Sequence, residues 1–270
     1  MKLVKPQTYL VGHSVVYWPG MEDFLRETEN LGFLTTMEEA RNVGVSEAEM
    51  VASFYAKLCY KSLTEGKNPG VEKVRPIKAN LQGCFQQGHG SVFEHSWFNF
   101  VTTGTSRIET HEHVRHRVGV AYSQESGRFC RPVDGQIEFV ATELFNADDP
   151  LFEEVRSIIM DIGGQIEYAY QSLEALMGDR LKSPETKKLF TSFLRRILPN
   201  GMANILGWSA NVRQLRHMIV MRTASHAEEE IRQVFSQVWD LLLAHSPTSL
   251  YGLEARPVTG SAFPEIIEVL

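Results

Sequence analysis

The sequence predicts an α+β fold, a helix-rich single domain with a small mixed or antiparallel sheet. Several long segments place apolar residues at helical spacing, while a few short segments alternate as strands do. The regular strand–helix–strand rhythm of a doubly wound sheet is missing from the sequence. A chain of 270 residues, of which 43% are hydrophobic, is long enough to bury a sizeable core.

The elements of the first half are set by local signals. Ser46 and Glu49 form a capping-box pattern before a run of apolar residues at helical spacing. Gly88-His89-Gly90 ends a second periodic segment. The sequence therefore predicts helices over 46–59 and 74–87, a strand over 97–103, and a helix over 106–117 that is capped by Ser106 and Glu109.

The second half is more helical. A cap and a first-turn proline at Ser183 and Pro184 predict the start of one helix. Apolar periodicity predicts another long one before it. We expect a strand over 137–141, helices over 151–177 and 183–196, a turn over 199–201, an extended segment over 202–209, and helix over 211–245 with a break near 223–225.

Composition excludes several classes of protein. The formal charge of −6 argues against a nucleic-acid-binding protein, which usually shows a basic excess. No apolar run reaches the roughly 20 residues of a membrane helix, and His13, Tyr17 and Pro19 interrupt the first 20 residues, so we expect a cytoplasmic protein without a membrane partner. The three cysteines have no CxxC spacing and predict neither disulfides nor a thiolate metal site.

The most informative segment runs from Ser106 to Arg128 and crowds arginine, histidine, carboxylate and hydroxyl groups together. On a helix, Glu112, Arg115 and His116 share one face. Such a cluster is often only a solvated face with Glu/Arg pairs. Here it continues into Ser126-Gly127-Arg128, a hydroxyl, a small residue and a guanidinium that together suit a phosphate. The segment predicts a site for a small anion such as a nucleotide.

Five histidines lie near each other in sequence, which raises the alternative of a metal site. His111 and His113 point in different directions on a helix, and no HExxH or CxxC pattern supplies a chelating pair. We therefore predict no metal. The histidines more simply bond within the core or to a ligand: they are His89, His95, His111, His113 and His116.

Three blocks of residues resemble the flavin-dependent thymidylate synthase family. Gly88 to His95 resembles its Gly-His-x-Ser/Thr-x-x-Glu-His motif, and Arg115-His116-Arg117 leading to Ser126-Gly127-Arg128 resembles its signature. The third block comprises Arg195 to Pro199, Asn211-Val212-Arg213, Met221-Arg222, His226-Ala227 and Glu230-Ile231. The resemblance covers about residues 50–250. It implies an N-terminal extension at 1–45 packed on the core, a catalytic domain at 46–250 and a C-terminal tail at 251–270.

The resemblance implies a homotetramer that binds FAD across subunits and methylates dUMP to dTMP. Methylenetetrahydrofolate would give the carbon and NADPH the electrons. The implied FAD-binding residues are Ser91, Glu94, Arg115, His116, Arg117, Gln124, Asn211, Arg213 and His217. The implied nucleotide-binding residues are Glu112, Arg115, Gln124, Glu125, Ser126, Gly127, Arg128, Arg195 and Arg222, and Arg222 is the implied catalytic residue. A fixed guanidinium there would stabilise negative charge on the pyrimidine ring.

The chain also departs from the family pattern. Eight residues, 118–125, separate Arg117 from Ser126 where relatives usually have seven, which predicts a remodelled loop between flavin and nucleotide. Phe129 replaces a usual Tyr, and Glu112 stands where many relatives have Gln. These changes keep two alternatives open: a C5-methylase of UMP or another pyrimidine nucleotide, and a non-catalytic protein that binds flavin and nucleotide. A metal-dependent hydrolase is a third alternative.

Overall fold

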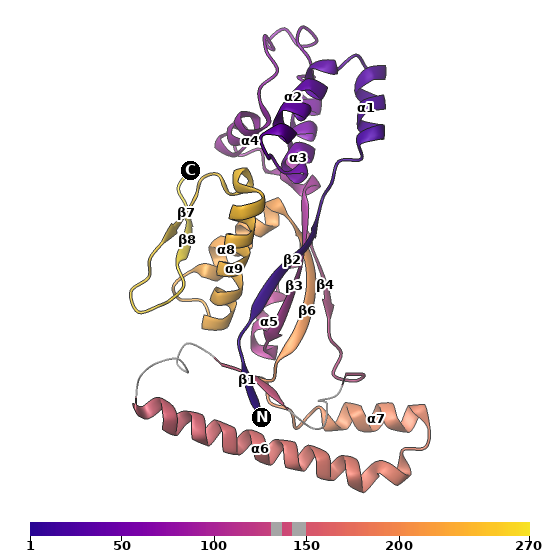
Figure 1. The fold of residues 1–270 in the computed structure, drawn as a ribbon, viewed down its shortest axis with the longest axis vertical. Helices are drawn as coiled ribbons and strands as arrows, with labels where there is room; N and C mark the ends of the chain where they lie inside the picture. The colour runs from indigo at the N-terminus through magenta and orange to yellow at the C-terminus, as the bar shows by residue number, and fades with distance from the viewer. Residues whose placement is uncertain (131–136, 142–149) are drawn as a thin grey trace.

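A computed structural model describes residues 1–130, 137–141 and 150–270. Its centre is a four-stranded sheet of order β2-β3-β6-β4, in which every neighbouring pair is antiparallel (Figure 1). The strands are β2 (Gln7–His13), β3 (Trp97–Thr105), β4 (Val120–Gln124) and β6 (Asn204–Asn211). The predicted strand at 97–103 and the predicted extended segment at 202–209 are confirmed. The expected α+β class with a small antiparallel sheet is confirmed as well.

The remodelled loop expected at 118–125 is wrong, because residues 120–124 form β4. Val120 pairs with Ala210 and Gln124 with Leu206 of β6. The segment alternates between half-buried and exposed residues, as an edge strand does. Gly119 stands directly before the strand and has a φ of +67°, a turn conformation that favours glycine. Because of this glycine, the sequence indicates a loop where the strand begins.

Four helices gather at one end of the sheet: α1 (Trp18–Glu27), α2 (Leu31–Asn42), α3 (Glu47–Cys59) and α4 (Ile77–Gln86) (Figure 1). The capping box predicted before α3 is confirmed. Ser46 Oγ accepts a hydrogen bond from the Glu49 backbone N at 3.2 Å, and the Ser46 backbone N donates to Glu49 Oε2 at 3.2 Å. The first two helices and β2 lie within residues 1–45, the predicted N-terminal extension, for which the sequence predicted no elements.

Two further helices, α8 (Val212–Thr223) and α9 (Glu229–His245), pack beside the sheet together with the hairpin of β7 (Leu253–Arg256) and β8 (Glu265–Glu268) (Figure 1). The predicted break near 223–225 is confirmed, because α8 ends at Thr223 and Glu228 caps α9. Short 3₁₀ helices occupy Gly90–His95 (η1), Gly178–Arg180 (η4) and Pro247–Leu250 (η5).

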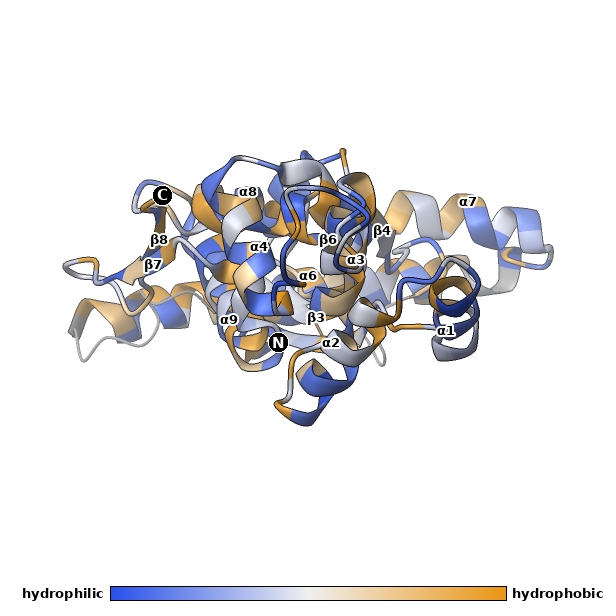
Figure 2. Cartoon of the chain, turned by 90° about the horizontal axis from the view of Figure 1, so that it is seen from above, coloured by the Kyte–Doolittle hydropathy of each residue, from blue (hydrophilic) through white to orange (hydrophobic). Residues whose placement is uncertain are grey.

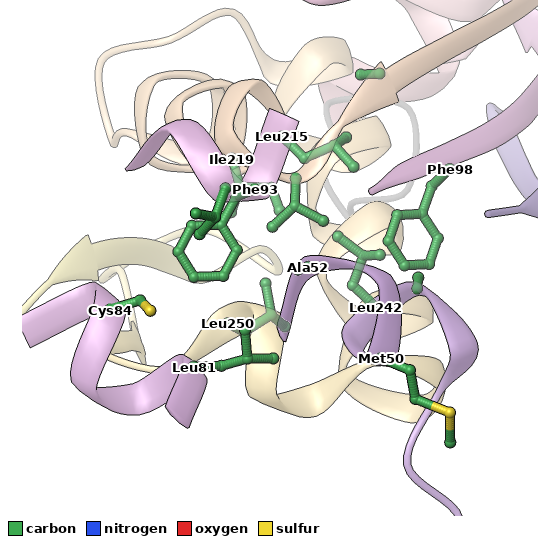
Figure 3. Packing of buried hydrophobic residues seen from close by; sticks show 14 of the residues in the cluster. Met50, Ala52, Leu81, Cys84, Phe93, Phe98, Leu215, Ile219, Leu242 and Leu250 are labelled. Atoms are coloured by element: carbon green, nitrogen blue, oxygen red, sulfur yellow. The ribbon is translucent and has the colours of Figure 1, made fainter. Parts of the chain in front are cut away.

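The main hydrophobic core joins the sheet to these two groups of helices. Figure 3 shows Phe98 of β3 and Leu242 of α9 close to Met50 and Ala52 of α3, with Leu215 of α8 above them. All of these side chains are almost completely buried. Burying a side chain of this size contributes roughly 1.5–3 kcal/mol. The core therefore fixes the positions of α8, which carries predicted site residues, and of α3, which lies beside others.

The predicted helix over 106–117 is shorter than expected, since α5 spans Arg107–His113. The next backbone N–H groups bond three residues back, Arg115 to Glu112 and His116 to His113, so the chain tightens and leaves the helix. Tyr122 Oη donates to the carbonyl oxygens of His113 at 2.8 Å and His116 at 3.0 Å. A strand residue thus satisfies the carbonyls at the end of the helix.

Two helices extend across the end of the molecule opposite to α1–α4, α6 (Pro150–Met177) and α7 (Pro184–Leu194) (Figures 1 and 2). They share a small core of their own, formed by Tyr170, Phe190 and Leu194. Ser183 caps α7 as predicted, accepting from the Thr186 backbone N at 3.2 Å. Beside them β5 (Glu138–Val140), also predicted, pairs in parallel with β1 (Lys2–Val4). Among the described helices, none has the length and apolarity needed to cross a bilayer.

Candidate active site

The side chain of Arg222, near the end of α8, forms hydrogen bonds with Glu112 of α5 and with His116, which lies just after α5. Arg222 Nη1 donates to Glu112 Oε2 at 2.9 Å, and Nη2 donates to the Glu112 carbonyl oxygen at 3.1 Å. Arg222 Nε donates to His116 Nε2 at 2.8 Å. All three guanidinium nitrogens therefore donate a hydrogen bond, which fixes the orientation of the guanidinium plane. Three residues that the sequence singled out converge here.

His116 must be neutral for this arrangement. Its burial, followed by the positive charge of Arg222, lowers its pKa to about 4. Because Nε2 accepts from Arg222, the single ring proton lies on Nδ1, and the Gln214 side-chain amide 3.4 Å away must present its oxygen to that N–H. The ring of His217 on α8 lies 5.9 Å from that of His116, so His116 stands between His217 and Arg222. One neutral imidazole thereby links the two halves of the predicted site.

A second group of arginines includes Arg107, which contacts the chain just after β4, and Arg195 near it. Arg107 Nη2 donates to the Glu125 carbonyl oxygen at 3.3 Å, and a Cβ on Gly127 would lie 3.8 Å from the same nitrogen. Burial and the nearby charge of Arg195 lower the pKa of Arg107. Arg107 was missed in the sequence, although it lies in the charged segment directly after the helix cap Ser106. Two guanidinium groups close to one backbone turn favour an anionic ligand.

Arg128 adds a buried polar group that has no partner among the described residues. Its Nε is buried and forms no hydrogen bond within the described part of the chain. The backbone N of Arg128 donates to Ser126 Oγ at 3.4 Å, which folds the Ser-Gly-Arg turn on itself. Buried N–H groups in proteins almost always have an acceptor. A bound oxyanion would supply one at Arg128.

Three further residues that are predicted to bind the nucleotide are Gln124, Arg195 and Arg115. Gln124 Nε2 donates to Thr110 Oγ1 on α5 at 2.9 Å. Arg195 lies just after α7 and is exposed. Arg115 and Arg117 are exposed and form no ion pair with any described residue. The expectation that Arg115 shares a helical face with Glu112 and His116 is wrong, because α5 ends before it.

Two of the predicted flavin-binding residues, Arg213 and His217, line a cavity of about 280 Å³. Arg213 and His217 lie four residues apart on α8 and line the cavity together with Arg216, His89 and Gly90. Arg213 Nη1 donates to Glu94 Oε1 at 2.6 Å, which joins α8 to η1. Ser91 on η1 is exposed. The cavity is at the lower limit of small-molecule sites, which measure roughly 300–1,000 Å³.

Asn211, another predicted flavin ligand, already has a structural role. It caps α8, with Oδ1 accepting from the Gln214 backbone N at 2.9 Å. A Cβ on Gly119 would lie 2.5 Å from Asn211 Nδ2, so only glycine leaves room at the start of β4. The cap thus also positions the strand that carries Gln124.

A buried network supports α5 from beneath. Glu109 Oε1 and His113 Nδ1 are 2.7 Å apart and completely buried. Glu230 of α9 accepts from Ser106 Oγ at 2.6 Å and from Thr105 Oγ1 at 3.0 Å. Burial raises the pKa of Glu230 to about 7. Among the described residues, no group of three or more His, Cys, Asp or Glu side chains forms a candidate metal site.

The N-terminal cap of α5 is confirmed only in part. Ser106 Oγ accepts from the backbone N of Ile108 and of Glu109, as expected of a cap. The Glu109 carboxylate turns to His113 instead of the Ser106 backbone, and Glu230 accepts from that backbone N at 2.5 Å. A residue 124 positions away therefore completes the box.

Comparisons with known proteins agree with this geometry. A family model described as thymidylate synthase complementing protein matches residues 43–248. The flavin-dependent thymidylate synthase of Corynebacterium glutamicum is 31% identical over 208 residues, covering 76% of this chain and 79% of that protein. The enzyme of the same name from Mycobacterium marinum is 32% identical over 203 residues, covering 74% and 77%. That from Mycolicibacterium vanbaalenii is 33% identical over 192 residues, covering 68% and 71%. The chain belongs to the flavin-dependent thymidylate synthase family of enzymes.

Proposed function

We propose that this enzyme methylates C5 of dUMP to form dTMP, with methylenetetrahydrofolate as carbon donor, NADPH as reductant and FAD as cofactor. The relatives are named flavin-dependent thymidylate synthases, which supports the reaction class. The observation that carries the proposal is Arg222, whose guanidinium is fixed by Glu112 at one end of α5, the short helix whose first residue is Arg107.

In this proposal the nucleotide phosphate binds at the turn after β4. Arg128 has a buried N–H there that finds no acceptor among the described residues, and Arg107 and Arg195 add positive charge. Each charge-assisted hydrogen bond to phosphate is worth about 1.5–3 kcal/mol. The remaining contacts would come from the predicted set: Glu112, Arg115, Gln124, Glu125, Ser126, Gly127 and Arg222.

Arg222 is the proposed catalytic residue. Methylation at C5 requires an electron-rich pyrimidine ring, and a guanidinium at the uracil edge stabilises the negative charge that develops there. To reach the ring, Arg222 Nη1 would exchange the Glu112 carboxylate for a uracil oxygen or N3. Its Nε can stay bonded to His116, because that ring is neutral. The guanidinium thus keeps its plane while its outer edge changes partner.

We infer that FAD occupies the cavity lined by Arg213 and His217, with Ser91, Glu94, Arg115, His116, Arg117, Gln124 and Asn211 as further contacts. FAD, when bound, carries the reducing electrons between NADPH and the transferred carbon. The exposed Arg115 and Arg117 are free to bind its phosphates. A cavity of about 280 Å³ is small for a dinucleotide. This size supports a cofactor site that other subunits complete.

The proposed homotetramer has a suitable surface. Leu151, Ile158, Ile162 and Leu176 of α6 are each at least half exposed, and their separations of seven, four and fourteen residues place them along one stripe. On α7, Leu189 and Phe193 are also exposed, and Figure 2 shows hydrophobic segments on this projecting helix. An apolar stripe of this kind favours a helix from another copy. Light scattering should give the mass of four chains, whereas a monomer with bound FAD would contradict the proposal.

The substrate is tested directly. The purified protein is incubated with methylenetetrahydrofolate, NADPH and either dUMP or UMP, and the product is identified by mass. We expect dTMP. Methylation of UMP instead would favour the ribonucleotide methylase, an alternative supported by the eight residues between Arg117 and Ser126. Without a methylated product from either nucleotide, only the binding protein remains. A colourless protein would contradict both flavin enzymes.

A further inference from the structure

A second cavity adjoins the proposed flavin cavity. It has a volume of about 290 Å³ and is lined by α3, α4 and the chain between them. Cys84 and His89 line both cavities, so the two share a wall. Its lining includes Lys57, Lys73 and Arg75, and it is therefore named the basic cavity.

The positive charge of the basic cavity is unbalanced. Among the described residues that line it, none is Asp or Glu. Lys57 is only 2% exposed, and its ammonium forms neither a hydrogen bond nor an ion pair within the described chain. It lies 5.8 Å from the ring centre of Phe33. Burial, followed by the charge of Arg75, lowers the pKa of Lys57 to about 8. A buried ammonium is costly without a counter-ion.

The walls of the basic cavity are ordered by specific contacts. Asn68 Nδ2 donates to the Tyr60 carbonyl oxygen at 2.7 Å, and Asn68 Oδ1 accepts from the Gly70 backbone N at 3.0 Å. These bonds fold the chain between α3 and α4 over the cavity. On α4, a Cβ at Gly83 would lie 3.8 Å from Arg75 Nη1, so the guanidinium lies against the helix at that point. The three cations are thus part of a folded wall.

We propose that the basic cavity binds the negatively charged end of a co-substrate whose reactive end enters the flavin cavity. This inference rests on the proposed function. Tyr60 and His89 stack with ring centres 6.0 Å apart at the shared wall, which offers flat surfaces to the aromatic part of such a molecule. The shared chemistry is an oxyanion joined to a heterocycle. Its two sources are the glutamyl carboxylates of methylenetetrahydrofolate and the phosphates of NADPH.

The test removes two surface cations and leaves the core intact. The double variant Lys73→Gln with Arg75→Gln changes exposed residues only, and Lys78→Gln on α4 is the control, since it is exposed and lies outside the basic cavity. Calorimetry on the purified protein measures the dissociation constants of monoglutamyl and tetraglutamyl methylenetetrahydrofolate, NADPH and pyrophosphate. Binding needs no turnover, so a failure of dUMP methylation refutes the proposed function and leaves this result readable.

We expect the double variant to raise the dissociation constant of one co-substrate by about tenfold or more. The dissociation constants of the control should stay within about twofold of those of the parent protein. A loss that is larger for the tetraglutamyl than the monoglutamyl folate assigns the folate tail. A loss for NADPH alone assigns the dinucleotide phosphates. Lys57→Met, which removes the charge and shortens the unbranched side chain by one atom, should weaken the binding of the same ligand. Unchanged binding of both co-substrates overturns the proposal, including the case in which only pyrophosphate responds.

Discussion

Arg222→Lys separates a catalytic role for Arg222 from simple charge attraction. In the free enzyme the guanidinium makes three hydrogen bonds, to His116 Nε2, Glu112 Oε2 and the Glu112 carbonyl oxygen. A lysine ammonium keeps the charge and can retain the Glu112 ion pair, but loses the planar fork. The pair is partly exposed, with side-chain exposures of 16% and 37%, so the loss of folding stability should be about 1–2 kcal/mol.

The effect on turnover should be larger than the effect on binding. Removing one donor that acts on developing negative charge costs about 10²–10³ in kcat, or roughly 2.7–4 kcal/mol. Nucleotide affinity should fall by less than about tenfold, because the positive charge remains. Steady-state kinetics with dUMP measures kcat and KM, and calorimetry measures nucleotide affinity. The flavin absorption spectrum should persist.

The matched control is Arg26→Lys, an equal substitution at an exposed position on α1 far from the sheet centre. It should leave kcat, KM and flavin content unchanged. Equal losses of kcat and nucleotide affinity in Arg222→Lys would reduce Arg222 to a binding residue. An unchanged kcat would refute the reasoning altogether.

Four further substitutions test the surrounding charges. Glu112→Gln should tighten nucleotide binding about five- to tenfold, because Arg222 no longer has to break an ion pair with a carboxylate before it binds the nucleotide. Glu254→Gln, at an exposed position of β7, is the control, and weaker nucleotide binding by Glu112→Gln would contradict the prediction. Arg128→Ala and Arg195→Ala should each weaken nucleotide binding by about 1.5–3 kcal/mol in calorimetry while flavin stays bound, and an unaltered affinity would show that the pocket is misassigned. Glu230→Gln tests the raised pKa of Glu230, which is about 7 in the fold against 4.5 for an ordinary glutamate, so that the folded state binds more protons between these pH values and the stability of the parent should fall relative to the variant by up to about 3 kcal/mol as pH rises from 4.5 through 7. Urea unfolding that shows a pH-independent difference between the two proteins would refute it.

Local signals made some elements predictable. Ser46 and Ser183 each cap a helix within three residues of themselves, and a cap needs no distant partner. The break after Thr223 follows from residues that start a new helix nearby. By contrast, β2 was missed because it is an edge strand whose pairing to β3 is set about 90 residues later in the chain.

The candidate site was predictable as a set of residues but not as an arrangement. Family motifs identified Glu112, His116 and Arg222, yet the bonds between them span 106 and 110 residues. The end of α5 depends on Tyr122, a residue of the next strand, so helical periodicity alone extended the helix too far. Arg107 carries no motif signal of its own, and only the fold brings it near Arg195.

The short helix α5 gives two carboxylates opposite environments. Glu109 points into the core, where it meets His113 at 2.7 Å, and Glu112, three residues later, lies at the surface of the site on Arg222. The buried carboxylate cannot move without leaving His113 Nδ1 without its partner, at a cost of several kcal/mol. Because Glu109 is fixed in this way, the Glu112 carbonyl oxygen is fixed as well, and it is one of the three acceptors of Arg222. The core network of α5 and α9 therefore determines where the proposed catalytic guanidinium lies before any substrate binds.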